Sequence, residues 1–491
     1  MNDAYPRAAE IRAAKGAFIN NEWVPVSTGR TVPVVAPAEG VVFAEIAASG
    51  PADVDLAVKA ARAAYEGGSW SQLNPIERGR LLQKLGRLIL ENIEELAALE
   101  ARDCGKPMRL ARGDVEAIAR YFEFYGGAAD KVHGEQIPFL NGYYVTGERE
   151  PLGVTGHIIP WNYPLQMMGR TLAPALAMGN ATVLKPAEDA CLAPLRVTEL
   201  AAQAGFPPGA INVVPGLGHE AGAALSEHPG IDFISFTGSP QVGVMVQTAA
   251  AKNHVGCVLE LGGKSPQIIF EDADLEAALP VVVAAIVQNS GQTCSAGARV
   301  LIQDSIWDKV TAELAKRFNA LKAGLPEDNP DLGPVINAKQ KRRIESFLER
   351  AKADNIPVIG QGRLHEKAPV DGFYVLPTIY GPVPRDNALA CEEIFGPILA
   401  AMPFKDEADA LALANGTEYG LVAGIWTTDT KRAVRLARKV RAGQVYINAY
   451  GAGGGIELPF GGVKKSGHGR EKGFEALYEF SALKTIVMKH D

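Results

Sequence analysis

The feature that most constrains the fold is a regular alternation of short apolar runs and helical segments across residues 153–263. Five apolar runs bounded by glycine, proline or polar residues have the length of strands, and four amphipathic or apolar segments between them have the length of helices. This order predicts parallel strands joined by crossover helices, so we expect a doubly wound parallel sheet. The five runs are VTGHIIP, ATVLKP, INVVPG, IDFISFTG and HVGCVLELGG.

The rest of the chain supplies further layers. Residues 17–50 alternate as short strands, and residues 52–125 show leucines at helical spacing, where we expect packing helices and no catalytic residue. A second α/β pattern begins near residue 264, with a helix expected at about 275–287. The last stretch, SALKTIVMKH, is strand-like after a domain that already looks complete. We expect it to pair outside its own core, with a subunit boundary as one candidate place.

Composition excludes several classes of protein. The 491 residues are 47% hydrophobic and 21% charged, with 52 glycines, which is typical of a large, loop-rich enzyme of two or three domains. A net charge of −7 without a basic run argues against a nucleic-acid partner. No apolar run reaches the length of a membrane span, and the N-terminal segment lacks a signal sequence, so we expect a cytoplasmic protein. The five scattered cysteines indicate neither disulfides nor a metal site.

Polar and glycine-rich motifs follow the predicted strands. Because ligands of such sheets bind beyond the carboxyl ends of the strands, we expect a nucleotide there. FTGS opens a helix, where free amides favour a phosphate, although a plain helix cap explains it equally well. Lys185 and Glu188 follow another strand, where a carboxylate can accept ribose hydroxyls and repel a 2′-phosphate. The alternative for this pair is a solvated ion pair.

Cys294 lies in the segment NSGQTCSAGAR, in a setting of glycine, serine, threonine and alanine with almost nothing bulky nearby. A thiolate nucleophile requires a partly open pocket rich in amides, whereas a lone cysteine is more often inert. Asn162 can donate to an oxyanion, and Glu260, beside two glycines at a strand end, is the candidate base. Gly291 and Gly297 are expected to leave room for the reactants.

These motifs occur together in a recognisable order. IPWNYP, LKPAE, FTGS, LELGGKSP, NSGQTCSAGAR, EEIFGP and LPFGGVKKSGHGRE resemble the aldehyde dehydrogenase superfamily over nearly the whole chain. The resemblance implies an α/β, Rossmann-like NAD-binding domain at 1–128 and 150–261, and an α/β catalytic domain at 262–465. It also implies a small β oligomerisation element at 129–149 and 476–491.

The resemblance implies a complete mechanism. Cys294 is similar to the nucleophile that attacks the aldehyde, with its oxyanion held by the Asn162 side chain and the Cys294 N–H. Hydride transfer then leaves a thioester, which Glu260 hydrolyses by activating water. Glu471 matches an acidic residue that the family places behind this glutamate.

The resemblance also implies a cofactor, NAD in preference to NADP. Lys185 and Glu188 resemble contacts to the adenosine ribose, Ser239 a contact to the pyrophosphate, and Glu393 a contact to the nicotinamide ribose, with Phe395 against the ring. The further residues expected near the cofactor are Ile158, Ile159, Pro160, Trp161, Gly218, Gly222, Phe236, Gly238, Val242 and Leu261.

The substrate position departs from the family pattern. Many members carry a lysine where this chain has Thr171, which puts a proton relay through that lysine in doubt. The neighbouring position, often aromatic, is Arg170. It resembles the arginine with which succinate-semialdehyde dehydrogenases grip a distal carboxylate, whereas their second arginine is Gln288 here. A structural ion pair is the alternative for Arg170. The other residues expected at the substrate are Tyr163, Met167, Thr293, Ser295, Tyr450 and Ile456.

Two alternatives to a hydrolytic, NAD-dependent enzyme stay open. A CoA-acylating enzyme passes the acyl group to a thiol, and Glu260 argues against it because that branch usually lacks this glutamate. A catalytically silent, structural member is the other, and the intact set of Cys294, Glu260, Asn162 and Lys185 argues against it. We expect a homodimer or homotetramer.

Overall fold

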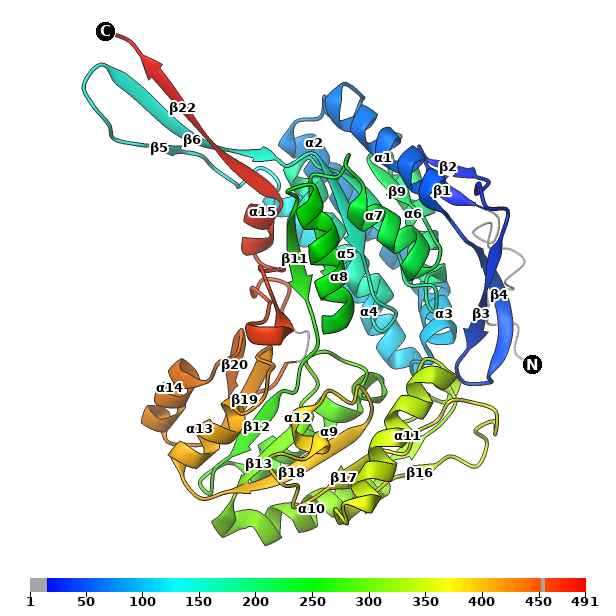
Figure 1. Cartoon of the computed structure of the whole chain (residues 1–491), viewed down its shortest axis with the longest axis vertical. Helices are drawn as coiled ribbons and strands as arrows, with labels where there is room; N and C mark the ends of the chain where they lie inside the picture. Colours follow the sequence, from blue (N-terminus) through cyan, green and yellow to red (C-terminus); the bar gives the residue numbers. More distant parts are fainter. Residues whose placement is uncertain (1–15, 452–454) are drawn as a thin grey trace.

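The computed structural model describes residues 16–451 and 455–491, arranged as two lobes and a projecting arm (Figure 1). The N-terminal segment 1–15, where no signal sequence is expected, lies outside the described residues. Among the described helices, none is both long and apolar enough to cross a membrane. The α/β fold class expected from the sequence is confirmed.

The first lobe is built on an eight-stranded sheet of order β2-β1-β9-β8-β7-β10-β11-β21. Its five central strands are parallel, as predicted for residues 153–263. They are β7 (Val154–Ile158), β8 (Ala181–Lys185), β9 (Ile211–Val213), β10 (Phe233–Thr237) and β11 (Gly256–Glu260). The edges are antiparallel additions: β1 (Ala17–Ile19) with β2 (Glu22–Val24), and β21 (Gly467–His468). Short strands were expected at 17–50, but their pairing with this sheet and the strand β21 were not.

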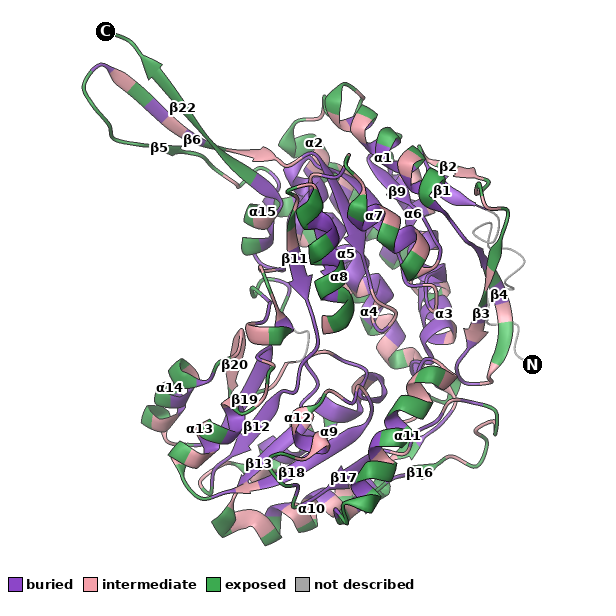
Figure 2. Cartoon of the chain, in the orientation of Figure 1, coloured by how far each residue is buried: buried purple, intermediate pink, exposed green. Residues whose placement is uncertain are grey.

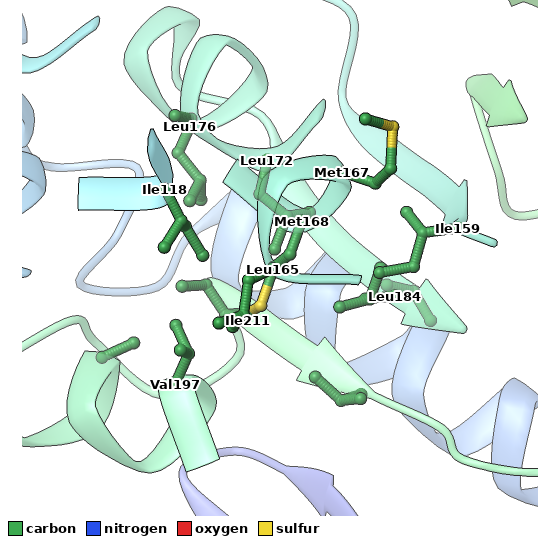
Figure 3. Close-up of a cluster of buried hydrophobic side chains, with 14 of the residues drawn as sticks. Ile118, Ile159, Leu165, Met167, Met168, Leu172, Leu176, Leu184, Val197 and Ile211 are labelled. Atoms are coloured by element: carbon green, nitrogen blue, oxygen red, sulfur yellow. The ribbon is translucent and has the colours of Figure 1, made fainter. Parts of the chain in front are cut away.

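Crossover helices connect these strands. The third crossover is a π turn, Gly218–Gly222, that continues into a short helix, α7 (Ala223–Glu227). The other three are α5 (Pro164–Met178), α6 (Leu192–Ala204) and α8 (Pro240–Lys252). Helix α5 is almost wholly buried, because its apolar faces meet the sheet on one side and a helical layer on the other. Figure 3 shows Leu165, Met168 and Leu172 of α5 against Ile118 of that layer and Ile211 of the sheet.

The helical layer comes from the residues that showed leucines at helical spacing. The Asn74 side chain caps the second helix by accepting from the Glu77 N–H, and the Glu77 carboxylate accepts from the Asn74 N–H. A two-stranded hairpin, β3 (Thr31–Ala36) with β4 (Val41–Ala47), precedes the layer. The helices are α1 (Pro51–Glu66), α2 (Pro75–Glu91), α3 (Ile93–Cys104) and α4 (Met108–Ala128).

The second lobe has a seven-stranded sheet of order β15-β17-β18-β13-β12-β19-β20, and its core strands are fully buried (Figure 2). The strands are β12 (Pro266–Ile269), β13 (Arg299–Gln303), β15 (Val358–Gln361), β17 (Thr378–Tyr380), β18 (Ile398–Phe404), β19 (Val422–Trp426) and β20 (Gln444–Ile447), with a separate pair β14 (Lys322–Ala323) and β16 (Arg363–Leu364). The helices are α9 (Leu275–Val287), as expected, α10 (Trp307–Ala320), α11 (Ala338–Ala353), α12 (Ala388–Cys391), α13 (Glu407–Asn415) and α14 (Thr430–Lys439).

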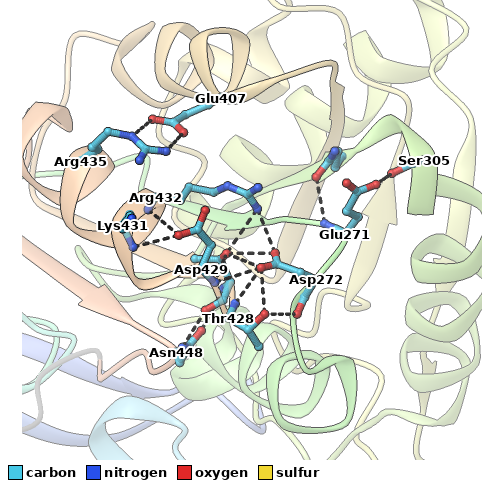
Figure 4. Close-up of polar contacts among 12 residues, drawn as sticks. Glu271, Asp272, Ser305, Glu407, Thr428, Asp429, Lys431, Arg432, Arg435 and Asn448 are labelled. Atoms are coloured by element: carbon cyan, nitrogen blue, oxygen red, sulfur yellow. Dashed lines mark hydrogen bonds and ion pairs between the residues drawn. The ribbon is translucent and has the colours of Figure 1, made fainter.

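A polar cluster ties β12 to the turn after β19 (Figure 4). The Asp272 carboxylate accepts from the hydroxyls of Thr427 and Thr428 and from the Asp429 N–H, and pairs with Arg432 at 3.0 Å. Asp429 in turn caps α14. These bonds fix the end of the second sheet away from the lobe junction.

The arm is a three-stranded antiparallel sheet of β5 (Glu135–Gln136), β6 (Tyr143–Pro151) and β22 (Ser481–Lys489). The C-terminal strand β22 therefore pairs outside its own core, as expected, but with β6 of the same chain over nine residue pairs. A short helix, α15 (Glu475–Glu479), leads into β22. The arm's role in assembly stays a prediction.

Candidate active site

Two neighbouring cavities lie at the junction of the lobes. The larger, of about 530 Å³, draws its walls from both lobes, and the smaller, of about 310 Å³, contains Cys294. Asn162 and Thr237 line both cavities. A group bound in the larger cavity therefore lies next to the Cys294 thiol.

The Cys294 loop is held by hydrogen bonds to the segment 333–336. Ser290 donates its hydroxyl to the Gly333 carbonyl at 2.8 Å, and the Gln292 side chain accepts from the Ile336 N–H at 2.9 Å. Asn289 and Ser290 both have positive φ, an uncommon conformation that such bonds maintain. The loop is thus a fixed support for the thiol.

The glycines around Cys294 have a different purpose from the one expected. A Cβ at Gly291, whose φ is +72°, would lie 2.1 Å from the Gly396 carbonyl oxygen, and one at Gly297 would lie 2.5 Å from the Gln267 side chain. The prediction that they leave room for reactants is wrong, because protein atoms fill that space. Gly262 and Gly263 are equally constrained: added Cβ atoms would meet the Glu393 carboxylate and the Cys294 carbonyl oxygen. These contacts bring the end of β11 against Cys294.

We expect Gly291→Ala to destabilise the protein by about 2–4 kcal/mol, because the new methyl group meets backbone atoms at a left-handed φ. The denaturant midpoint measures this effect. Gly127→Ala is the matched control, since a Cβ there meets nothing within 4 Å inside helix α4, and it is expected to leave stability unchanged or slightly raised. Equal midpoints for the two variants would contradict the prediction.

Electrostatics at Cys294 favour the neutral thiol. Burial raises the pKa of Cys294 to about 11, while the Arg170 guanidinium opposes the increase. Asn162 lies beside the Cys294 loop. Its side-chain amide donates to the Gln292 backbone carbonyl at 2.9 Å, and its backbone carbonyl accepts from the Asn289 side chain. The amide has a second N–H. That hydrogen is the group expected to face an oxyanion.

Arg170 is paired with two carboxylates of the protein itself. Its guanidinium lies 3.2 Å from Glu260 and contacts Glu471, and all three side chains are buried. It also lies over the Phe460 ring, 4.3 Å from the ring centre. The alternative interpretation, a structural ion pair, is what the structure shows. The expectation that Arg170 grips a substrate carboxylate is not supported, because its charge is already matched.

Glu260 ends β11 and does not line either cavity in this structure. Burial raises the pKa of Glu260 to about 8, Arg170 opposes that shift and Glu471 adds to it. Its Oε1 atom has no hydrogen-bond partner among the described residues. The oxygen has unused acceptor capacity, but it is buried and is not in contact with either cavity.

The cofactor residues fall into two groups. In the first, Lys185 pairs with Glu188 at 2.7 Å, the Gly218 N–H donates to Glu188 at 3.3 Å, and Gly222 lies beside the Lys185 side chain. The second group lines the larger cavity: Pro160, Trp161, Gly238, Ser239, Glu393 and Phe395. The expected residues that line neither cavity are Ile158, Ile159, Phe236, Val242 and Leu261.

Three residues of the second group have defined contacts. Ser239 caps α8, accepting from the Val242 N–H at 3.3 Å, as the plain-cap alternative anticipated. Glu393 accepts from the Gly263 N–H at 2.9 Å, and burial raises the pKa of Glu393 to about 7. Phe395 meets Trp161 edge to face.

The substrate residues mostly meet around Cys294. Tyr163 is hydrogen-bonded to Thr293 at 2.9 Å, and the residues expected here that line the smaller cavity are Tyr163, Met167, Arg170, Gln288, Thr293 and Ser295. Tyr450 lies behind this group, donating to the Ser295 carbonyl at 2.6 Å. Ile456 packs in the first lobe's core rather than in the cavity wall. Residues 452–454 of the same loop lie outside the described residues.

Comparison with known proteins decides the family. The model of the aldehyde dehydrogenase family matches residues 23–486. The chain belongs to the aldehyde dehydrogenase family. It is 41% identical to human retinal dehydrogenase 2 over 485 residues, covering 98% of this chain and 92% of the relative.

Solved structures agree with this assignment. A putative aldehyde dehydrogenase from Burkholderia cenocepacia is 59% identical, with a TM-score of 0.96 over 97% of this chain and 100% of the other. PnpE from Pseudomonas sp. WBC-3, solved in complex with nicotinamide adenine dinucleotide, is 40% identical, with a TM-score of 0.94 over 97% and 98% of the two chains. The resemblance inferred from the motifs is thus confirmed.

Several wall residues of this aldehyde dehydrogenase were not anticipated. Helix α4 and the turn before it, where no functional residue was expected, supply part of the smaller cavity's wall. Gln166 could have been found from its helical spacing with Tyr163 and Arg170. Thr237, Asn289 and Phe460 lie within the motifs quoted above, but no role was expected for them. The others carried no sequence signal; they are Lys106, Arg109, Leu110, Gly113, Asp114 and Lys472.

Proposed function

We propose that this aldehyde dehydrogenase oxidises its aldehyde with NAD through a Cys294 thiohemiacetal and thioester, followed by Glu260-assisted hydrolysis. The observation that carries the proposal is the position of Cys294 and Asn162 in one cavity that adjoins a second, lined by Ser239, Glu393 and Phe395. The first lobe's parallel strands end at this junction, which is where dinucleotides bind such sheets.

The residues present fit such a cofactor. Lys185, Glu188 and the Gly218 N–H form a polar group suited to ribose hydroxyls, and the buried Glu393 carboxylate faces the larger cavity. Bound NAD would supply the hydride acceptor. Its complexes in related structures, such as that of PnpE, support this choice.

The protein's own groups divide the chemistry. The Cys294 thiol loses its proton to solvent, the thiolate sulfur bonds to the carbonyl carbon, and the C=O π electrons move to the oxygen. The Asn162 amide and Cys294 N–H stabilise the resulting oxyanion. After hydride departs as the C–H bond breaks, a thioester remains on Cys294. Glu260 accepts a proton from the attacking water, the C–S bond breaks, and the acid leaves.

The test is steady-state NADH formation with a panel of aliphatic, aromatic, amino and carboxylated aldehydes, each with NAD and with NADP. We expect acid production with NAD and no need for a thiol co-substrate. A strict requirement for CoA would instead identify an acylating enzyme. Succinic semialdehyde stays in the panel, although the ion pairs of Arg170 remove the residue on which that substrate was expected.

Glu188→Gln is expected to raise the ratio of kcat/KM with NADP to that with NAD by about tenfold or more. The carboxylate that would repel a 2′-phosphate disappears, while the amide retains the shape of the side chain. Measuring kcat/KM with both cofactors checks this. Glu199→Gln is the control, because Glu199 is a partly buried glutamate that accepts from the Trp23 side chain. It is expected to leave the ratio unchanged. An unchanged ratio in Glu188→Gln would remove this residue as a basis for cofactor choice.

We propose that the arm joins subunits of a homo-oligomer, because β22 exposes four large apolar side chains, two on each of its faces. They are Leu483, Ile486, Val487 and Met488. Sedimentation measurements distinguish a dimer from a tetramer, and a monomer at micromolar concentration would overturn the proposal. A cytoplasmic location stays a prediction from the sequence.

A further inference from the structure

The Arg170 cluster contains an unusual balance of buried charge. Arg170 is 2% exposed, Glu260 2% and Glu471 1%, so one cation lies between two carboxylates with almost no water. Buried charges are costly unless they are paired, and removing one partner leaves the others uncompensated. Arg170 is therefore the cation that contacts both carboxylates.

The second oxygen of Glu471 is fixed from the opposite side. Ser235 donates its hydroxyl to Glu471 at 3.2 Å, and Thr171 donates to Ser235 at 2.8 Å. His157 bonds to Thr171 through Nδ1, and its Nε2 bonds to Thr155. Burial lowers the pKa of His157 to about 3, so the ring is neutral. With Nδ1 as the donor, every proton of the chain points toward Glu471.

Thr171 therefore belongs to the neutral part of this network. Its neighbour on the same helix, Arg170, carries the positive charge. The Thr171 hydroxyl orients Glu471 through Ser235, and the guanidinium supplies the positive charge. The network therefore has a cation between the glutamates.

We propose that Arg170 is a positioning residue for hydrolysis, whose guanidinium anchors Glu471 and stabilises the ionised form of Glu260 beside the Cys294 cavity. This inference rests on the proposed function, since it assigns a helper to the Glu260 base. It also replaces the role in substrate binding that was expected for this arginine.

No other group near Glu260 can stabilise its ionised form in place of Arg170 without changing the pH dependence of thioester hydrolysis. The groups that face the cluster are Tyr121 and Tyr125 of α4, Cys294, Arg470 and Lys472. The pKa of Lys472 is lowered to about 7 by burial and by Arg170, so its charge is only partial near neutral pH. Removing Arg170 would also raise the pKa of Lys472, which offsets part of the lost charge. The pKa of Glu260 would still rise, because Arg170 is the cation that contacts it directly.

The experiment measures the pH dependence of thioester hydrolysis in the full-length enzyme with NAD and its best aldehyde. Arg170→Met is expected to shift the midpoint upward by at least about one pH unit and to slow turnover at neutral pH about tenfold, with the first-turnover burst of NADH retained. Glu471→Gln is expected to shift the midpoint downward, because it removes the carboxylate that raises the pKa of Glu260. Structural damage alone does not produce opposite shifts.

A positive charge restored at position 170 or 171 should restore the pH dependence of thioester hydrolysis. Arg170→Lys or the double variant Arg170→Met/Thr171→Lys is expected to move the midpoint back toward that of the wild type. Arg62→Met is the control, since it breaks an arginine–carboxylate pair with Asp232 in the same lobe without touching the cluster. Thermal unfolding of each variant confirms that it is folded.

A second readout does not require catalysis. Arg170 lowers the pKa of Cys294, so alkylation of Cys294 by iodoacetamide at a fixed mildly alkaline pH should slow by roughly fivefold or more in Arg170→Met. Unchanged pH midpoints in Arg170→Met and Glu471→Gln, or an unchanged alkylation rate, would overturn the inference. Failure of the wild type to oxidise any aldehyde would instead overturn the proposed function, and the alkylation rates would still decide the role of Arg170.

Discussion

Cys294→Ala is expected to abolish aldehyde-dependent NADH formation, with kcat falling by at least about 10³-fold. No thioester can form without the sulfur, and no other cysteine can replace it. The described cavity around residue 294 contains no second thiol, since Cys104 and Cys191 are buried elsewhere. Steady-state absorbance of NADH with the aldehyde panel measures the loss.

The control for this variant is Cys391→Ala. Cys391 is a partly exposed cysteine at the end of α12, whose thiol lies near the Arg385 carbonyl and lines neither cavity. Its replacement is expected to leave kcat within about twofold. NAD binding, followed by quenching of tryptophan fluorescence, should survive in both variants. Residual turnover in Cys294→Ala above about 1% of the wild-type rate would reject Cys294 as the nucleophile.

The sequence predicted the central strands and α9 well, because their signals are local. Each apolar run of β7, β8 and β10 is short, flanked by turn residues and buried on both faces, as parallel strands require. The same reasoning could not find β21, a two-residue strand that pairs with β11 from far along the chain. Pairing of that kind depends on tertiary position rather than on local composition.

The site was predicted in part for the same reason. Motif order located Cys294, Asn162 and Glu260, whose surroundings differ from those of ordinary core residues. The sequence left Arg170 open between a substrate contact and a structural ion pair, because its partners, Glu260 and Glu471, are distant in sequence and only the fold brings the three charges together. Lys106 carried no signal either, since its position in the cavity wall depends on how α4 packs against α5.

Glu260→Gln is expected to separate the two halves of the reaction. The first turnover needs Cys294 and the hydride acceptor, so a burst of NADH close to one per active site should persist. Hydrolysis of the thioester then lacks its base, and steady-state kcat is expected to fall by about 10²–10⁴-fold. Rapid mixing with NAD and aldehyde measures both phases in one experiment.

The pH dependence identifies the base independently. A carboxyl group acts as a base only when ionised, so wild-type hydrolysis should rise with pH through the raised pKa of Glu260, about 8, and fall about tenfold per unit below it. The burst rate should keep rising at higher pH, because it follows ionisation of Cys294, whose pKa burial raises to about 11. In Glu260→Gln the steady-state rate should no longer show the transition near pH 8, whereas the burst rate should still rise with ionisation of Cys294.

Glu227→Gln is the matched control for that variant. Its carboxylate pairs with Lys252 on the exposed surface of the first lobe, and both rates should equal those of the wild type. If Glu260→Gln abolished the burst together with steady turnover, Glu260 would act before hydride transfer, as a base for the Cys294 thiol. A burst that persists while hydrolysis stops would place Glu260 at the water, which is the role that its unbonded Oε1 at the end of β11 favours.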